Sequence, residues 1–476
     1  MLDLDSPLTS SPDAADAVRE ALADRVRGVL QARTNGTSRL VRVGVSLPRT
    51  VDPLRWLRAQ DGGEAAYWSA RNGDAPVGMV GVADVVESDD HPIDYDGLQR
   101  QLAARFDRAE APLRYYGGVR FDAAHPGARS DGGEGWDRFR TYRFVLPRFE
   151  LHSRADGATL VCNLVLPRDA GRDAAILEAV RGLSFPDVEA PGTLPEPFGR
   201  TDVPDRDGWT RMVRWALDAI AERSLDKVVL ARRVALELGT PLDPFFVLQH
   251  LKEATPACFH FAVRPASGST FLGASPERLF RRDGDRVVSE AVAGTRERGD
   301  TPEADAALRD ELMESPKERR EHAFVQEAIR EKLEGLCTAV DAPDAPSDLA
   351  LARGRHLHAR LTGTLRSGTT PLDLLDALHP TPAVGGVPTD AALAAIRTQE
   401  PFDRGWYAGP VGWIGADAAE FAVAIRSGLV QDDRLALFSG AGIVDGSEPA
   451  REWDEIEQKI GDFASILGLD GHAAAA

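Results

Sequence analysis

The spacing of apolar residues changes along the chain, and each change predicts a different kind of secondary structure. In residues 13–32, apolar side chains recur every three or four positions from Val18 to Leu30, which predicts an amphipathic helix that ends near residue 35. From there to about residue 165, short alternating runs broken by glycine, proline and aspartate predict antiparallel strands. Beyond residue 208, helical and strand patterns alternate to the end. The sequence therefore predicts a mixed α and β fold.

Residues 185–208 separate these two parts of the chain. The segment reads FPDVEAPGTLPEPFGRTDVPDRDG and is rich in proline, glycine and aspartate, which predicts a linker. No repeat of fixed period is evident elsewhere in the sequence. The last residues, ending in GHAAAA, are expected to be frayed.

Composition bounds the class of protein. A chain of 476 residues with 43% hydrophobic residues can bury a large core and has room for two or three domain-sized units. The formal net charge of −19 argues against a nucleic-acid partner, because non-specific nucleic-acid binding needs a basic surface. Three well-separated cysteines give neither a disulfide framework nor a zinc site. Without a secretory signal or a long apolar run, we expect a cytoplasmic protein that does not bind membranes.

Lysine is scarce in this sequence. Only five of the 56 lysine and arginine residues are lysine, namely Lys227, Lys252, Lys317, Lys332 and Lys459. Dispersed acidic residues with so little lysine are typical of proteins that stay dissolved at high salt, where screening weakens self-repulsion, and they predict a halophilic source. Each lysine that is kept becomes a candidate for a role that needs a primary amine.

Lys227 is the strongest of these candidates. It begins the strand pattern KVVLARRVAL, whose alternation places it on the same face as Val229 and Ala231. A desolvated lysine can lose its proton and act as a base or nucleophile, whereas arginine stays protonated. The alternative is a lysine at a strand end whose amine reaches the solvent.

Residues 271–299 hold further candidates. Ser275-Pro276 predicts a turn that ends a strand and holds Glu277 at the sheet edge, where its carboxyl group could stay protonated and serve as a general acid. The alternative is a glutamate in the first turn of a helix, favoured there by the helix dipole. In Gly294-Thr295, a residue without a side chain precedes a hydroxyl group, so both can approach a small ligand closely.

The segment ESPKERREHAFVQEAIREKLEG predicts an acidic helix. Ser315 is its expected N-cap and Glu318 stands at the third helical position, which together predict a capping box. Glu321 follows on the same side and lies next to the apolar stripe that includes Val325. Its carboxylate is therefore predicted close to the protein interior.

A second acidic helix is predicted in PAREWDEIEQKIGDFASIL. Glu452 and Glu455 repeat the spacing of three, and Lys459 follows Glu455 by four positions. One alternative is that both acidic helices expose solvated faces with ordinary glutamate–lysine support. If the helices instead face each other, their oxygen atoms would make a hard-cation site suited to Mg²⁺.

The strand pattern over residues 420–430 (EFAVAIRSGLV) places Arg426 over two alanines, which leaves room for a ligand carboxylate beside the guanidinium group. Residues 438–449 offer glycines and backbone amides for an anion, but they lack the GK[ST] of a nucleotide-binding loop. His356 and His358 share a strand face. They could bind a metal, but no third ligand is adjacent, so a structural role is favoured.

Ten collinear features of the sequence resemble the chorismate-utilising enzymes. They are Lys227, GASPE, AGTR, SPKERREH, RHLHARLTGTL, LHPTPAVGGVP, FDRGWYAGPVGW, AIRSG, GAGIV and EWDEIEQK. That family includes isochorismate synthases, salicylate synthases and the large subunits of anthranilate and aminodeoxychorismate synthase. The resemblance is strong over residues 205–467 and weaker upstream, where DPLRWLRAQDGGEAAYW and YYGGVRFD are similar to isochorismate synthases.

The resemblance implies an α+β fold with a single large catalytic domain. Two large antiparallel β-sheets would pack together as an α/β sandwich, with helices outside and the active site between its halves. Residues 205–467 would form the chorismate-binding catalytic region, residues 1–200 a family-variable N-terminal α/β region of the same sandwich, and residues 468–476 a frayed tail.

The resemblance also implies roles for individual residues. Lys227 matches the base that activates a water molecule, and Glu277 matches the general acid. Mg²⁺ is the implied cofactor, with Glu321 and Glu455 as its ligands and Glu318 and Glu452 as their neighbours. The positions that match substrate-binding residues for chorismate are Gly294, Thr295, His356, Tyr407, Arg426, Gly442 and Lys459. Arg426 would bind a substrate carboxylate.

Three features choose among the members of the family, namely Lys227, Ala293 and residues 379–388. Anthranilate synthases typically carry glutamine at the position of Lys227, and aminodeoxychorismate synthases carry a nucleophilic lysine where this chain has Ala293, so neither amination nor a glutamine amidotransferase subunit is expected. Salicylate synthases share Lys227 and Glu277, but residues 379–388 (HPTPAVGGVP) look like isochorismate synthases. Isomerisation of chorismate to isochorismate is therefore predicted. The alternatives are a salicylate synthase, which would go on to eliminate pyruvate, and a non-catalytic relative. The sequence leaves menaquinone and siderophore biosynthesis open.

Overall fold

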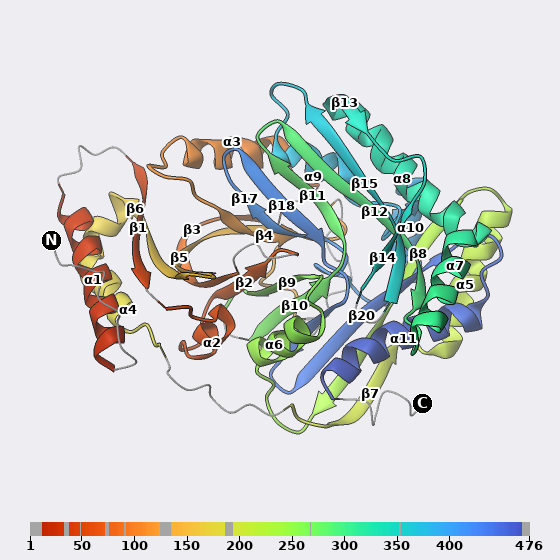
Figure 1. Cartoon of the computed structure of the whole chain (residues 1–476), viewed down its shortest axis with the longest axis horizontal. Helices are drawn as coiled ribbons and strands as arrows, with labels where there is room; N and C mark the ends of the chain where they lie inside the picture. The colour runs from red at the N-terminus through yellow and green to blue at the C-terminus, as the bar shows by residue number, and fades with distance from the viewer. Residues whose placement is uncertain are drawn as a thin grey trace.

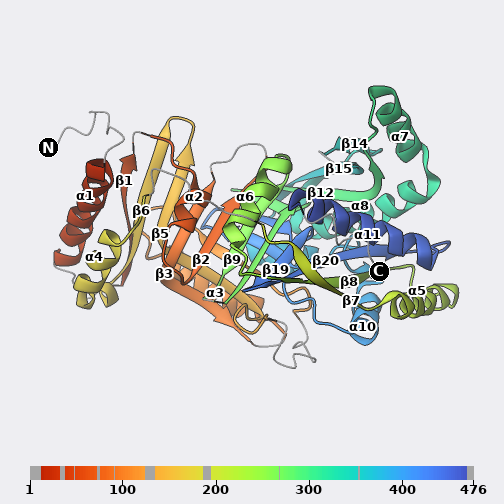
Figure 2. The same cartoon turned by 90° about the horizontal axis from the view of Figure 1, so that it is seen from below.

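The computed structural model describes residues 12–32, 38–47, 49–71, 76–89, 92–123, 135–185, 194–266, 268–351 and 354–468. Within them, twenty strands form one hydrogen-bonded network, with helices on its outer sides (Figure 1). Helices α1 and α4 lie at the end of the molecule near the N-terminus, whereas α5, α7, α8, α10 and α11 gather at the other end (Figures 1 and 2).

The strands are β1 (Arg39–Leu47), β2 (Ala65–Ser69), β3 (Val77–Ser88), β4 (Tyr115–Val119), β5 (Tyr142–Arg154), β6 (Gly157–Leu166), β7 (Pro197–Val203), β8 (Lys227–Leu238), β9 (Phe259–Arg264), β10 (Ser269–Ser275), β11 (Arg278–Asp283), β12 (Arg286–Glu297), β13 (Cys337–Asp341), β14 (Ser347–Ala350), β15 (Gly354–Leu365), β16 (Gly386–Val387), β17 (Pro410–Ile414), β18 (Ala418–Val423), β19 (Ser427–Gln431) and β20 (Arg434–Ile443). The helices are α1 (Pro12–Gln31), α2 (Pro53–Arg58), α3 (Tyr95–Phe106), α4 (Asp173–Arg181), α5 (Arg206–Ala221), α6 (Pro244–Ala254), α7 (Pro302–Glu314), α8 (Pro316–Leu336), α9 (Pro371–Leu378), α10 (Thr389–Gln399) and α11 (Pro449–Ile466), with a short 3₁₀ helix at Arg168–Gly171.

Strand β5 joins two arms of the network, and the ladders in both arms are antiparallel. One arm runs through β3, β2, β9, β10, β19, β20 and β8, and carries β7 and β16 along β8. The other runs through β4, β17, β18, β11, β12 and β15, and ends with β13 and β14. These arms correspond to the two large antiparallel sheets predicted from the sequence, and the predicted fold class is confirmed.

Two short connections (crossings) between the arms lie next to each other. The first crossing, Pro276 and Glu277, links β10 of one arm to β11 of the other, and the second links β18 to β19. Two hydrogen bonds hold the crossings together: Ser275 Oγ donates to Val423 O at 2.6 Å, and Val423 N donates to Glu277 O at 3.1 Å. Both crossings therefore occupy a fixed position between the arms.

The structure confirms some sequence predictions for the N-terminal part and corrects others. The helix predicted over residues 13–32 is α1, although its predicted end near residue 35 lies outside the described residues. Strands β1, β3, β5 and β6 are present where alternation predicted them, whereas β2, β4 and the helices α2 and α3 were not predicted. Helix α2 starts after Asp52, whose carboxylate accepts hydrogen bonds from Leu54 N and Arg55 N. This N-cap, followed by proline, was the missed signal.

Only part of the segment over residues 185–208 can be the predicted linker, because the rest has regular secondary structure. Residues 186–193 lie outside the described residues, but the segment also contains β7 and the start of α5. Strand β7 pairs along β8, so its backbone groups are satisfied by the sheet rather than by solvent. Within the residues that the structure describes, no helix combines the length and apolar character needed to cross a membrane.

Candidate active site

A cavity of about 540 Å³ lies beside the two chain crossings and is bordered by α8 and α11. All but one of the residues predicted for the site line this cavity. They are Glu277, Gly294, Thr295, Glu318, Glu321, His356, Tyr407, Arg426, Gly442, Glu452, Glu455 and Lys459. The exception is Lys227, which lies just behind the lining and contacts two residues of it. The fold thus brings together residues that are more than 200 positions apart in the sequence.

Lys227 is buried at the start of β8, with only 1% of its surface exposed, so the alternative of an amine that reaches solvent is wrong. Its Nζ donates a hydrogen bond to Glu321 Oε1 at 2.9 Å. Gly442, on the neighbouring strand β20, makes room for this pair. A Cβ atom there would lie 2.8 Å from Glu321 Oε1 and 3.0 Å from Lys227 Cε, so a larger residue would displace both side chains.

A buried ion pair fixes the strand that carries Lys227. Arg404 Nε donates to Glu400 Oε2 at 2.8 Å, and both side chains are almost completely buried. The pair also binds β8 directly: Glu400 Oε1 accepts from Ala231 N, and Arg404 Nη2 donates to Val229 O, both at 2.8 Å. This pair was not predicted from the sequence, although a glutamate and an arginine four positions apart at a helix end are a recognisable signal.

Glu277 lies in the first crossing with 4% of its surface exposed. Strand β11 follows it, so the alternative of a helix-first-turn glutamate is wrong. Burial raises the pKa of Glu277 to about 8, with Lys227 opposing the shift and Glu290 adding to it. A carboxyl group with this pKa carries its proton at neutral pH and can donate it, as a general acid requires.

Arg426 lies in the second crossing, and the predicted single strand over residues 420–430 is therefore wrong. Strand β18 ends at Val423 and pairs in one arm, whereas β19 begins at Ser427 and pairs in the other. Arg426 between them adopts φ 51°, the left-handed conformation that side-chain-bearing residues rarely adopt. At this turn the chain passes from one arm to the other, and Arg426 lines the cavity as predicted.

The two acidic helices face the same cavity, and the alternative of two solvated acidic faces is wrong for Glu318 and Glu452, which are 9% and 3% exposed. The capping box predicted for α8 is half formed. Ser315 Oγ accepts from Glu318 N at 3.4 Å, but Ser315 N donates to Leu312 O instead of to Glu318. The Glu318 carboxylate accepts from Arg296 at 3.0 Å, because a guanidinium group attracts it more strongly than a backbone amide does.

Each of the four carboxylates has a basic partner. The pairs are Glu318 with Arg296 at 3.0 Å, Glu321 with Lys227 at 2.9 Å, Glu452 with Lys317 at 3.5 Å and Glu455 with Lys459 at 2.6 Å. Burial opposes the charge of Lys317, but Glu452 and the other three glutamates raise its pKa overall. Lys317 was missed as a site residue, although the scarcity of lysine marked it: three of the five lysines meet here.

The glutamates on α8 and α11 can be compared with the ligands that Mg²⁺ prefers in proteins. Among the described residues, no three histidine, cysteine, aspartate or glutamate side chains converge closely enough to hold a metal ion by themselves. Mg²⁺ is commonly held by one or two carboxylates together with water and substrate oxygens, so a protein-only cage is not required. Four glutamates from two facing helices fit that pattern.

His356 and Gly294 lie next to each other in the lining of the cavity. Gly294 has φ 71°, and the β12–β15 register shifts by one residue at this point. His356 Nδ1 donates to Gly294 O at 3.1 Å and lies 3.1 Å from Thr295 Oγ1. Burial, with Arg426 adding to it, lowers the pKa of His356 to about 4, so the ring is neutral and its Nε2 is an acceptor.

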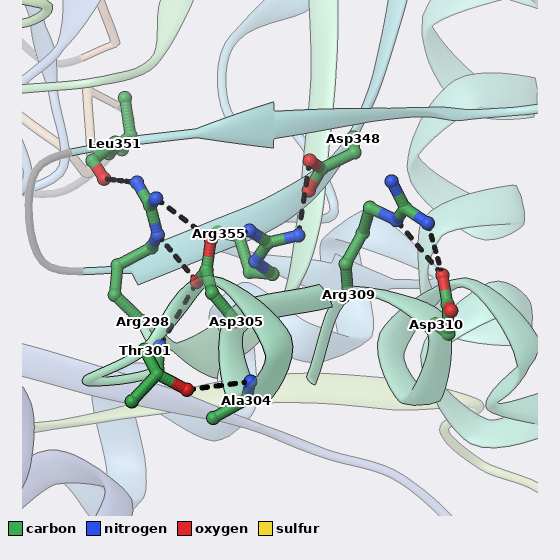
Figure 3. A network of polar contacts seen from close by, with 10 residues as sticks. Arg298, Thr301, Ala304, Asp305, Arg309, Asp310, Asp348, Leu351 and Arg355 are labelled. Atoms are coloured by element: carbon green, nitrogen blue, oxygen red, sulfur yellow. Dashed lines mark hydrogen bonds and ion pairs between the residues drawn. The ribbon is translucent and has the colours of Figure 1, made fainter. Parts of the chain in front are cut away.

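Helix α7 lines part of the cavity through Leu308 and Glu311. A polar network centred on Asp305 anchors this helix (Figure 3). Asp305 accepts from Arg298 Nε at 2.7 Å, from Gly299 N at 3.0 Å and from Arg355 Nη2 at 2.7 Å. The hydrogen bond from Arg298 is the main reason that the pKa of Asp305 falls to about 2. One carboxylate thus ties the first turn of α7 to β12 and β15.

We expect Asp305→Ala to raise KM for the substrate several-fold, because α7 would no longer be fixed over the cavity. Steady-state kinetics measures this change, and Asp310→Ala is the matched control, since Asp310 contacts only Arg309 on the same helix in Figure 3. Because the pKa of Asp305 is lowered in the folded protein, the anchor is present at neutral pH and is lost as pH falls toward about 2. Equal KM values for both variants would contradict the anchoring role.

Comparison with known proteins assigns the chain to a family. A family model described as chorismate binding enzyme matches residues 27–468. Isochorismate synthase, chloroplastic, from Catharanthus roseus is 32% identical over 514 aligned residues, covering 98% of this chain and 87% of that protein. Isochorismate synthase MenF from Bacillus subtilis (strain 168) is 37% identical over 359 residues, covering 74% of each chain. The chain belongs to the chorismate-binding enzyme family.

A solved structure agrees with this assignment. The menaquinone-specific isochorismate synthase MenF from Escherichia coli superimposes with a TM-score of 0.82 at 30% identity, covering 94% of this chain and 99% of that one. Anthranilate synthase component I from Streptococcus pneumoniae TIGR4 superimposes with a TM-score of 0.68 at 20% identity and shows a shared fold. The relatives that match over most of this chain are thus named as isochorismate synthases.

Proposed function

We propose that this chain is an isochorismate synthase, an isomerase that converts chorismate to isochorismate. The observation that carries the proposal is the placement of Glu277, a carboxyl group that keeps its proton, in the lining of a cavity, with the buried amine of Lys227 just behind that lining. Relatives named isochorismate synthases, which match over nearly the whole chain, support it.

The reaction exchanges one hydroxyl group of the substrate for another. Lys227 takes a proton from a water molecule, whose oxygen forms a bond to C2 of the ring. Glu277 gives its proton to the hydroxyl group at C4, so that the C4–O bond breaks and water leaves. A base and an acid at different positions around the ring are the minimum for this exchange. Because Lys227 contacts Glu321 in the structure, it must release a proton before it can act as the base.

The remaining predicted residues bind and orient the substrate. Arg426 suits a substrate carboxylate, because its guanidinium group can donate two parallel hydrogen bonds. Thr295, Tyr407 and Lys459 supply further donors, and Gly294 and Gly442 let the ring approach the backbone closely. The neutral His356 offers its Nε2 as an acceptor for a substrate hydroxyl group.

Mg²⁺ is the cofactor that we propose for this site. Glu321 and Glu455 would hold the ion, with Glu318 and Glu452 beside them. When bound, Mg²⁺ would supply a Lewis acid for the ring carboxylate of the substrate. The donor set supports this choice, because carboxylates from two facing helices plus water and substrate oxygens suit a hard cation.

The product of the purified enzyme tests the function. Exchange of one allylic alcohol for another is reversible, so chorismate and isochorismate, supplied separately, should reach the same mixture. Liquid chromatography follows both compounds, and a coupled dehydrogenase follows pyruvate. Stoichiometric pyruvate that is lost in Glu277→Gln would mean a salicylate synthase. No conversion from either side, with the fold intact, would mean a non-catalytic relative.

The sequence-based expectations about biological context stay predictions. Relatives include a menaquinone-specific enzyme and the salicylate biosynthesis isochorismate synthase of Pseudomonas aeruginosa, and the choice between menaquinone and siderophore biosynthesis stays open for this chain. The prediction that no glutamine amidotransferase subunit is needed depends on Lys227, where anthranilate synthases typically carry glutamine. Cytoplasmic location and a halophilic source also stay predictions from the sequence.

A further inference from the structure

A group of buried charges lies directly behind Glu277. At its centre is Glu290 on β12, which is 4% exposed. Glu290 Oε1 accepts from Arg278 Nη1 at 2.7 Å, and Glu290 Oε2 accepts from Arg71 Nη2. Arg278 Nη2 also donates to Glu420 Oε1 at 3.2 Å. Two arginines and two carboxylates in the interior are costly to bury unless they are paired, as they are here.

This group holds both residues that flank Glu277 in the sequence. On one side, Arg71 Nη1 donates to Pro276 O at 2.9 Å. On the other side, Arg278 is bound by Glu290. Both guanidinium groups also lie over the ring of Phe259, at 5.0 and 5.4 Å from its centroid. Glu290 therefore links the two arginines that fix the turn around Glu277.

The charges of the group also act on the Glu277 carboxyl group. Burial would raise the pKa of Glu290, but His358, Arg71 and Arg278 lower it to about 2, so Glu290 stays ionised. The charged groups that face Glu277 are Lys227 on β8, Glu290 on β12 and Arg71 after β2. Glu290 favours the protonated form of Glu277, whereas the two basic groups oppose it.

We propose that Glu290 is a positioning residue for Glu277: clamped between Arg71 and Arg278, it holds the turn that carries Glu277. The negative charge of Glu290 also favours the protonated form of the Glu277 carboxyl group. The inference rests on the proposed role of Glu277 as the acid of the reaction. Arg71 follows β2, so a residue from the N-terminal part of the chain also helps to hold the turn around Glu277. Two carboxyl groups with opposed protonation states are a common way to prepare an acid for catalysis.

Infrared pH titration of the metal-free, substrate-free enzyme tests the proposal directly. The carbonyl stretch of a protonated carboxylic acid is assigned to Glu277 by its absence in Glu277→Gln. In Glu290→Gln the midpoint of this signal should fall by about one pH unit, because a neighbouring negative charge is removed. In Arg71→Gln the midpoint should rise, because a positive charge is removed. Glu420→Gln is the matched control: it alters the same buried group but does not face Glu277, so its midpoint should not move.

The outcomes separate positioning from general destabilisation. An unchanged or higher midpoint in Glu290→Gln, or an equal shift in Glu420→Gln, would overturn the proposal. Circular dichroism checks that each variant folds. If Glu290→Gln does not fold, the comparison of Arg71→Gln with Arg71→Lys decides: the glutamine variant should shift the midpoint upward and the lysine variant should restore it, and identical midpoints would overturn the proposal. The titration needs no turnover, so failure of the isochorismate synthase assignment would appear separately, in the product assay.

Discussion

Lys227→Arg is expected to lower kcat by about 10³-fold or more, because general-base catalysis contributes on the order of 10²–10⁴ to the rate of such steps. Arginine keeps the positive charge but does not lose its proton in proteins, so the base is removed. The larger guanidinium group must also fit a site that is 1% exposed and enclosed by Gly442 and Glu321. Steady-state kinetics with chorismate measures the loss.

Two further variants make this result specific. Lys252→Arg changes another of the five lysines, which pairs with Asp52 at 3.5 Å and lies 30% exposed, and it should leave kcat unchanged. Lys227→Gln removes the base without adding bulk, so it should be as inactive as Lys227→Arg while its thermal unfolding is nearer to that of the parent. Substantial turnover in either Lys227 variant would show that another group activates the water.

Local patterns predicted the elements that carry the site, because each follows from short-range chemistry. The alternation that begins at Lys227 defines β8, and Ser315 with Pro316 defines the start of α8. The elements that carry Lys227 and Glu321 were therefore predicted correctly, whereas the roles of these two residues stay predictions. What these patterns could not give is which elements lie next to each other.

The two crossings show why the rest was missed. The continuous apolar run around Arg426 predicts one strand, but it is divided because β18 and β19 pair in different arms. The group around Glu290 depends in the same way on partners from β11, β18 and the segment after β2. A single charged residue in the apolar strand pattern VVSEAVAG was a signal that Glu290 needs a buried partner, but the identity of that partner is set by tertiary structure.

The scarcity of lysine indicated more of the site than the single residue Lys227 that was predicted from it. It directed attention to Lys227, and the structure places Lys317 and Lys459 at the same cavity. Arginine is larger and more widely branched, so compact ammonium groups suit a narrow site that already holds four carboxylates. Because lysine is scarce elsewhere in the chain, Lys227, Lys317 and Lys459 together indicate where the candidate site lies.

Glu321→Gln and Glu455→Gln are each expected to weaken Mg²⁺ binding by at least about tenfold, as even indirect changes around metal ligands do, and to remove activity with it. Isothermal titration calorimetry of the apo enzyme measures the affinity without any need for turnover. Glu331→Gln, an exposed substitution on the same helix α8, is the matched control and should bind Mg²⁺ like the parent.

The same variants decide how the metal-free site is stabilised. Repulsion among four clustered carboxylates alone predicts that each substitution stabilises the apo protein. The structure predicts the opposite for Glu321→Gln, since this change leaves the buried Lys227 ammonium without its partner at 2.9 Å, and a buried charge that loses its partner is strongly destabilising. Thermal unfolding in the presence of a chelator should therefore show a lower Tm for Glu321→Gln than for Glu331→Gln. A higher Tm, together with parental Mg²⁺ affinity, would mean that Glu321 neither holds the ion nor stabilises Lys227.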